Sequence, residues 1–262
     1  MATGLVKAKD SAQIVDYIDI DLPETGIGKG SLLMLDIIAK NDWERPIYFS
    51  GGSFDEQEYI WMTDYLQLDG LVYKLVPIKT ETESIFEKGR IDSELMYDIV
   101  MNWEWGNSGS SEIYHDPQTR KQFGVTHRIA LARLLEKLLE ENKVEKANTI
   151  IDLAMENIPV EYYDYSTFVE PFLNGYYQVG ETEKGRILFH QLKNIYQERL
   201  TYYSKLSMDG QYENIEELMA DLQAYRRIID ILAENKDTAL AERENKVFNR
   251  QLNMFQELLD QG

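Results

Sequence analysis

The 262-residue sequence contains no cysteine, only three histidines, and far fewer basic than acidic residues, 27 against 46. The absence of cysteine excludes disulfide bonds, thiolate catalysis and zinc sites with cysteine ligands. The formal net charge of −19 argues against binding of nucleic acid through its phosphates, because that mode needs a basic surface. Seventeen tyrosines, nine phenylalanines and four tryptophans are too many for a disordered acidic chain, so we expect a folded protein with a sizeable core.

Long hydrophobic runs are also missing. The most apolar stretch, residues 32–39, is interrupted by Asp36 and is far shorter than the ~20 residues that a membrane span needs. The first residues lack the apolar segment of a signal peptide. We therefore expect the chain as it stands to be soluble, and a piece cut from a longer protein would look the same.

Up to about residue 124 the hydrophobic pattern is mixed. Loose alternation and short apolar runs predict strands, and residues with helical spacing predict a helix that Ser31 caps. The expected strands are 13–21, 45–50 and 70–77, and the expected helices are 31–41 and 55–66. This order indicates a small α/β layer in residues 1–124, ending in a polar, loop-rich segment.

From residue 125 to residue 262 the apolar residues recur at three- and four-residue steps. The stripes predict six helices in three antiparallel pairs, near residues 131–138, 147–158, 168–179, 188–195, 215–232 and 248–259. The segment 142–147 recurs weakly as 180–185, each with a turn residue, a charged start and then a small residue. We therefore predict an α+β fold, with a small α/β domain (1–124) followed by a tetratricopeptide-like helical domain (125–262).

Several motifs invite a chemical role, but an ordinary structural role is favoured for each. The glycine-rich segment 26–31 departs from a phosphate-binding loop, because Pro23 and Gly30 occupy positions that the motif reserves for glycine and for serine or threonine. In so acidic a chain, metal-like spacings and carboxylate pairs arise by chance. The remaining candidates of this kind are Asp19 with Asp21, His115 with Asp116 and His127, His190, and Asp55, Glu56 and Glu58 with Glu44. We expect no catalytic residue, no metal site and no cofactor.

Aromatic residues interleaved with acids are the best candidates for ligand binding. Rings beside carboxylates can stack on sugars or anchor peptides, although helix pairs use the same residues as core. Tyr162, Tyr163 and Tyr165 lie between two predicted helices, and Trp103 and Trp105 flank a glutamate. We predict binding at these five residues.

The segments 41–49 and 65–77 together are distinctive. They resemble the C-terminal soluble part of a bacterial family of multi-pass membrane proteins of unknown function, which is similar to membrane-embedded protein O-mannosyltransferases. Residues 105–107, Tyr114, Asp116, Arg128 and 131–159 also look like that part of the family. Within the family's marker we interpret four matching residues as structural: Trp43, Arg45, Pro46 and Tyr48.

The resemblance implies a function for the chain as part of a larger protein. The family's sugar-transfer machinery would lie in the membrane portion, so no catalytic residue is carried over, and the domain would face the extracytoplasmic (periplasmic) side. We therefore expect a non-catalytic interaction domain whose partners are the membrane portion of the parent protein and an acceptor protein or glycan, and no nucleic acid. One alternative is a self-contained carboxylate- or metal-dependent carbohydrate-active enzyme built on Asp19 and Asp21 or on Asp55 and Glu58. The other is a purely structural domain that binds nothing else.

Overall fold

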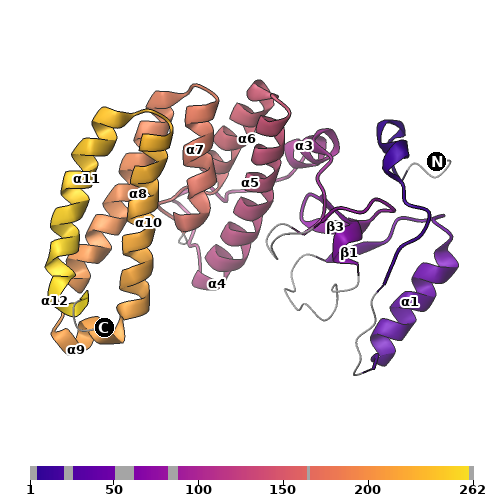
Figure 1. The fold of residues 1–262 in the computed structure, drawn as a ribbon, viewed down its shortest axis with the longest axis horizontal. Coiled ribbons are helices and arrows are strands. Elements are labelled where there is room, and N and C mark those ends of the chain that lie inside the picture. The colour runs from indigo at the N-terminus through magenta and orange to yellow at the C-terminus, as the bar shows by residue number, and fades with distance from the viewer. Residues whose placement is uncertain (1–4, 21–25, 51–61, 82–87, 164–165, 260–262) are drawn as a thin grey trace. The chain divides into compact units, whose positions relative to one another are not determined.

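The fold divides into two compact units, Met1–Trp105 and Gly106–Gly262 (Figure 1). The computed structural model describes residues 5–20, 26–50, 62–81, 88–163 and 166–259. A small sheet in the first unit is followed by helices, so the fold is α+β as predicted. The predicted boundary at residue 124 differs from the observed division, because residues 106–124 belong to the helical unit.

The first unit contains a three-stranded antiparallel sheet in the order β1-β3-β2. Its helices and strands are α1 (Lys29–Asn41), β1 (Tyr48–Ser50), β2 (Leu66–Asp69), β3 (Val72–Leu75) and α3 (Ser93–Met101). Gly70 permits the tight connection between β2 and β3 because its φ of +70° suits glycine. The side chain of Asp92 caps α3 by accepting the Leu95 backbone N–H at 3.3 Å.

Several sequence predictions for this unit were wrong in detail. The strand expected at residues 13–21 does not form in the described residues 13–20. Gln13 ends a 3₁₀ helix (Ala8–Gln13), and Ile14 makes a single bridge to Ile78. Residue 21 lies outside the described residues. Most of the expected helix at 55–66 also lies outside them, and its last residue begins β2. Helix α3 was missed because polar residues dilute its apolar stripe. With antiparallel neighbours and no βαβ unit among the described residues, the sheet is not an α/β layer.

Helix α1 was predicted well in extent but not in its cap. It begins at Lys29 after Gly28, so Ser31 lies inside the helix rather than at its N-cap. Its inner face packs Leu35 and Ile38 against a core cluster formed by Met62, Tyr65 and Leu75. The opposite face leaves three apolar side chains exposed: Leu32, Leu33 and Ile37.

The second unit is built from three helix pairs, α5 with α6, α7 with α8, and α10 with α11, and α8 also packs on α10 (Figure 1). Its helices are α4 (Pro117–Thr119), α5 (Val125–Glu140), α6 (Val144–Asn157), α7 (Glu170–Gln178), α8 (Thr182–Tyr203), α9 (Met208–Glu213), α10 (Ile215–Glu234), α11 (Thr238–Leu252) and α12 (Gln256–Leu259). A π-helical segment, Arg120–Gly124, joins α4 to α5. The six predicted helices correspond to α5, α6, α7, α8, α10 and α11, the last extended by α12.

The weak repeat noticed in the sequence has a structural cause. Each pair is joined by a three-residue connector, 141–143, 179–181 or 235–237, whose middle residue has a positive φ. These middle residues are Asn142 (56°), Gly180 (85°) and Lys236 (66°). Five residues after each comes a small buried residue, Ala147, Gly185 or Ala241, which lets the paired helices approach. The repeat therefore extends to the third pair, which the sequence analysis did not recognise.

Two matching polar clamps hold these pairs together. Asp152 of α6 accepts hydrogen bonds from the Tyr176 hydroxyl at 2.9 Å and from Lys184 Nζ at 2.7 Å. Asp237 accepts from the Tyr177 hydroxyl at 3.0 Å and from Arg186 Nε at 2.8 Å. The two adjacent tyrosines of α7 thus bind different neighbours: Tyr176 binds α6, and Tyr177 binds the connector between α10 and α11. Together they fix the position of α7.

Candidate functional site

The linker between α6 and α7 forms one wall of the candidate site and is firmly anchored. The Arg128 side chain is completely buried and donates to the backbone oxygens of Ile158 at 3.0 Å and Tyr163 at 3.4 Å. Tyr163 is only 2% exposed, and its hydroxyl donates to the Ser108 backbone oxygen at 3.0 Å. A Cβ at Gly124 would lie 2.9 Å from the Tyr163 ring, so glycine permits this packing.

The described residues among the five aromatics predicted to bind ligand belong to two different units. Tyr163 is core, whereas Tyr162 is half-buried and stacks on the His115 ring with centroids 5.5 Å apart. Trp103 and Trp105 lie in the first unit in edge-to-face contact, with centroids 5.3 Å apart. Tyr165 lies outside the described residues. Among the described members of this set, two pairs are close within their own units: Tyr162 with Tyr163, which are neighbours in the sequence, and Trp103 with Trp105.

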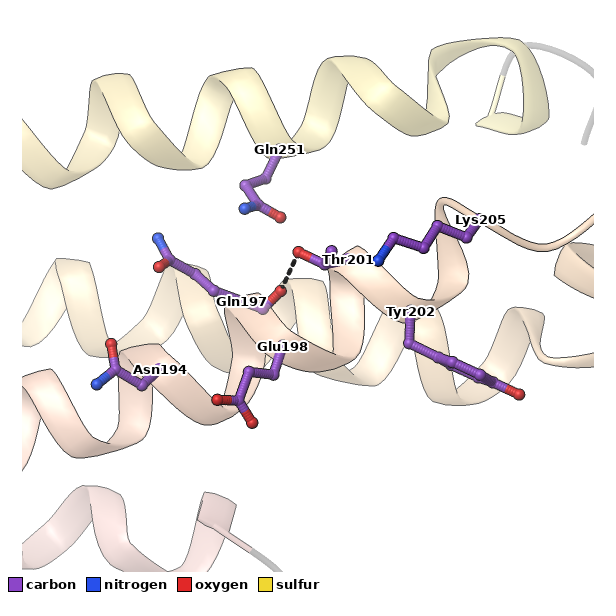
Figure 2. A pocket seen from close by; sticks show the side chains of 7 residues that line it. All are labelled: Asn194, Gln197, Glu198, Thr201, Tyr202, Lys205 and Gln251. Carbon is purple, nitrogen blue, oxygen red and sulfur yellow. Dashed lines mark hydrogen bonds between the residues drawn. The ribbon is translucent and has the colours of Figure 1, made fainter.

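A groove lined by polar and apolar side chains runs along α8, and Figure 2 shows the residues of the part that lies beside α11. It has two connected hollows of about 360 and 570 Å³ that share Asn194 and Glu198. One is bounded by the α6–α7 linker, and the other by Gln251 of α11, which projects toward α8 in Figure 2. We call this the α8 groove and define it by Glu161, Gln191, Asn194, Glu198, Thr201, Tyr202, Lys205 and Gln251.

The groove follows from the periodicity of α8. Its polar members at 191, 194, 198, 201 and 205 are spaced by alternating steps of three and four, which places them on one helix face. The opposite face carries the buried residues Leu188, Leu192, Tyr196 and Leu200. None of these polar residues was among the site residues predicted from the sequence. The polar stripe along α8 is visible in the sequence and could have indicated a binding surface. The structure shows in addition that the surface along this stripe is concave.

Hydrogen bonding divides the groove residues into two classes. Gln191 Nε2 donates to Glu161 Oε1 at 2.7 Å, and the Thr201 hydroxyl donates to the Gln197 backbone oxygen at 2.6 Å. The second class comprises Asn194, Glu198, Lys205 and Gln251, whose side chains make no hydrogen bond or ion pair within the described part of the chain. The Gln251 Oε1 atom is buried and has no partner there.

Next to the groove, charged side chains are compensated. Arg199 pairs with Asp221 at 3.1 Å, and Lys193 pairs with Glu244 at 2.7 Å. Burial raises the pKa of Asp221, and the Arg199 guanidinium opposes this shift. These pairs fix α8 against α10 and α11, and they leave Glu198 and Lys205 as uncompensated charges in the groove.

Glu170, at the start of α7, is the acid with the largest raised pKa that the structure gives. Burial raises its pKa from 4.5 to about 7, although Arg227, 4.0 Å away, favours the charged form. A carboxyl group that titrates near neutrality is a feature of many catalytic sites. Here, however, it does not line either hollow of the α8 groove.

The structure does not assemble the other predicted chemical candidates. His115 Nε2 hydrogen-bonds the Ser110 backbone oxygen, His127 Nδ1 hydrogen-bonds the Phe123 backbone oxygen, and Asp116 caps α4. Burial lowers the pKa of His127. Asp19 is exposed, and Asp21, Asp55, Glu56 and Glu58 lie outside the described residues. Within the described ranges no three histidine or carboxylate side chains converge as a metal site would require.

The four marker residues surround the turn between α1 and β1. Asp42 and Trp43 both have positive φ values, 44° and 57°, and Asn41 Nδ2 donates to the Arg45 backbone oxygen at 2.7 Å. The Trp43 ring packs against the core cluster of the first unit, whereas Arg45, Pro46 and Tyr48 are exposed. Burial and the nearby Asp69 carboxylate raise the pKa of Tyr48. The contacts of Trp43 are those of a structural residue.

Comparison with known proteins gives one match. Residues 1–95 match the family model described as TMEM260-associated domain 2, so this segment is similar to a domain associated with a membrane protein. The matched segment contains the α1–β1 turn and the whole described sheet. The chain matches no curated protein and no solved structure. None of the helices in the described residues has both the length and the apolar character of a membrane span.

Proposed function

We propose that this chain is a non-catalytic interaction domain of a membrane-embedded, glycosyltransferase-like protein, and that it binds a protein or glycan partner in the α8 groove. We propose further that it works on the extracytoplasmic side of the membrane. The observation that carries the proposal is the set of polar groove side chains that have no partner among the described residues.

The contrast with the rest of the helical unit supports this interpretation. Around the groove, Asp152, Asp237 and Asp221 accept hydrogen bonds from partners on neighbouring helices, and Lys193 forms an ion pair with Glu244. A buried acceptor such as Gln251 Oε1 costs about 1–3 kcal/mol when it is left without a donor. A partner whose N–H group reaches this acceptor after a rotation of the Gln251 carboxamide would recover that free energy.

The link to a membrane protein is supported by the first unit. Its similarity to a TMEM260-associated domain and the marker in residues 41–49 both fall within residues 1–95. The extracytoplasmic location is supported by the absence of lysine and arginine clusters in the sequence, since such clusters favour the cytoplasmic side.

Site-specific photocrosslinking in cells that make the natural protein tests the proposal. A photoreactive phenylalanine analogue at Thr201 lies in the groove, and the same residue at Glu242 is the matched control. Glu242 is exposed and stands nine residues before Gln251 on α11, half a turn away from the groove side. We expect a crosslinked protein or glycan in the membrane fraction at position 201 and none at 242. Equal crosslinking at both positions, or none at either, contradicts a groove-specific partner.

The extracytoplasmic location has a separate test. Protease added to the outside of spheroplasts should digest the domain without lysis of the cells. Protection until the cells are lysed would contradict this part of the proposal.

A further inference from the structure

We infer that the occupant of the α8 groove is an extended polypeptide segment that carries a basic and an acidic side chain in a fixed order. The inference rests on the proposed function, because it takes the α8 groove as the binding site and names the chemistry of the partner.

The length of the groove fits an extended peptide. From Gln191 to its last residue, Tyr203, α8 rises by about 18 Å at 1.5 Å per residue, and Lys205 follows two residues later. An extended chain advances by about 3.3 Å per residue, so about six residues would cover this distance. The two hollows share Asn194 and Glu198, so one continuous segment can occupy both.

The carboxamides in the groove match the chemistry of a peptide backbone. Asn194 and Gln251 each offer an N–H donor and a carbonyl acceptor, as a peptide bond does. Neither side chain has a hydrogen-bond partner within the described residues, and the Gln251 acceptor is buried. A backbone amide of a bound peptide can hydrogen-bond the exposed Asn194 carboxamide without any requirement on the peptide's side chains.

The charges in the groove give the peptide a direction. Glu161 lies on the hollow beside the α6–α7 linker, Glu198 lines both hollows, and Lys205 lies on the hollow beside α11. The Arg199 guanidinium, which also lines the first hollow, is already paired with Asp221. A basic side chain therefore fits the glutamate end and an acidic one fits the lysine end. Lys205 follows Glu198 by seven residues and lies two residues beyond the end of α8; a continued helical rise over this stretch is about 10 Å, or about three residues of extended peptide.

A glycan is the competing occupant. The Tyr202 ring is 59% exposed at the edge of the groove and could stack on a sugar. An uncharged glycan, however, would form no ion pair with Glu198 or Lys205. A peptide with one basic and one acidic side chain can pair with both, because the two charges lie at different points along the groove.

The test is selection of binders from a displayed library of random hexapeptides on the full chain. We expect enriched peptides to carry lysine or arginine about three positions from aspartate or glutamate, always in the same order. The double variant with Glu198→Lys and Lys205→Glu should enrich the reverse order. Glu198→Gln alone should weaken a selected peptide about two- to fivefold, as expected for an exposed charge pair. The matched control Glu242→Gln, whose side chain is exposed away from the groove, should leave its affinity unchanged.

Other outcomes overturn the inference. Enriched peptides without a charge order, or an order that the double variant does not reverse, would exclude this mode of recognition. Binding of mannohexaose or chitohexaose that Tyr202→Ala abolishes, with no peptide enriched, would identify a glycan site and leave the proposed function intact. Failure of every probe together with groove-specific photocrosslinks would overturn only the peptide chemistry, whereas failure of both experiments would overturn the proposed function as well. Circular dichroism and thermal melts of each variant show that the effects are not due to unfolding.

Discussion

Replacing Glu170 by glutamine should stabilise the protein at pH 8 and have little effect at pH 5. The Glu170 side chain is 21% exposed, and its pKa of about 7 in the folded state exceeds its ordinary value of 4.5 mainly because of burial. Between these two values the folded state binds a proton that the unfolded state has lost. The free energy of unfolding therefore falls as the pH rises from about 4.5 to about 7.

The magnitude follows from the shift in pKa. A difference of about 2.5 pKa units corresponds to an upper limit of about 3.4 kcal/mol. Partial exposure and screening by solvent reduce this figure, and we expect glutamine to gain about 1–2 kcal/mol over the natural residue at pH 8. At pH 5 the gain should fall to about a quarter of that, because Glu170 is then largely protonated in the folded state.

Urea denaturation of Glu170→Gln, of the natural protein and of Glu242→Gln, at half-unit steps from pH 5 to pH 8, measures this difference. Comparison with the natural protein cancels the titration of all other groups. A variant no more stable than the natural protein at pH 8, or equally stabilised at pH 5 and pH 8, would refute the assignment of a buried, neutral Glu170.

Two further substitutions test the packing of the helical unit. Asp237→Asn weakens one interhelix clamp and should cost about 1–3 kcal/mol at pH 7. The Arg186 hydrogen bond and other contacts hold the pKa of Asp237 in the folded state below its usual value of 3.8. The cost of the substitution should therefore shrink as the pH falls from 3.8 to the lowered pKa of the folded state. Thermal melts of the variant and the natural protein at pH 7 and pH 3 measure this change. Gly175→Ala places a Cβ 2.9 Å from a Leu135 methyl group and should destabilise by about 1–2 kcal/mol in urea titrations, after the gain in helix propensity is included. Gly30→Ala has open space around the new Cβ and should instead stabilise by up to about 1 kcal/mol, and a destabilised Gly30 variant would contradict this account of the two glycines.

The helical half of the fold was predictable because each helix carries its own amphipathic stripe. The stripe of Leu131, Leu134 and Leu138, for example, is the buried face of α5. The sheet was less predictable because its pairing is set by distant residues. In β2, Gln67 and Asp69 are buried and hydrogen-bonded to each other, whereas a strand with two polar residues reads as a loop or helix edge in the sequence alone.

The candidate site was largely invisible in the sequence. The sequence indicated Tyr162, Tyr163 and Tyr165 because aromatic rings beside acids can bind ligands, but Tyr163 is buried in the core. Asn194, Glu198 and Gln251 form a groove only because α8 and α11 lie beside each other, and no local pattern encodes that neighbourhood. The spacing of polar residues along α8 was present in the sequence, but spacing cannot distinguish a hollow from a convex surface.

The three-residue connectors have a consequence for how this architecture can vary. An inserted residue at Asn142, Gly180 or Lys236 would rotate the following helix and displace the small residue that fits against its partner. The segments between pairs, 158–169 and 204–214, are longer, and in the first of them the Arg128 hydrogen bonds fix the backbone at Ile158 and Tyr163. Changes in length are therefore expected to accumulate between pairs, and one of those segments forms a wall of the groove. A change there could alter what the groove accepts while the helical scaffold stays the same.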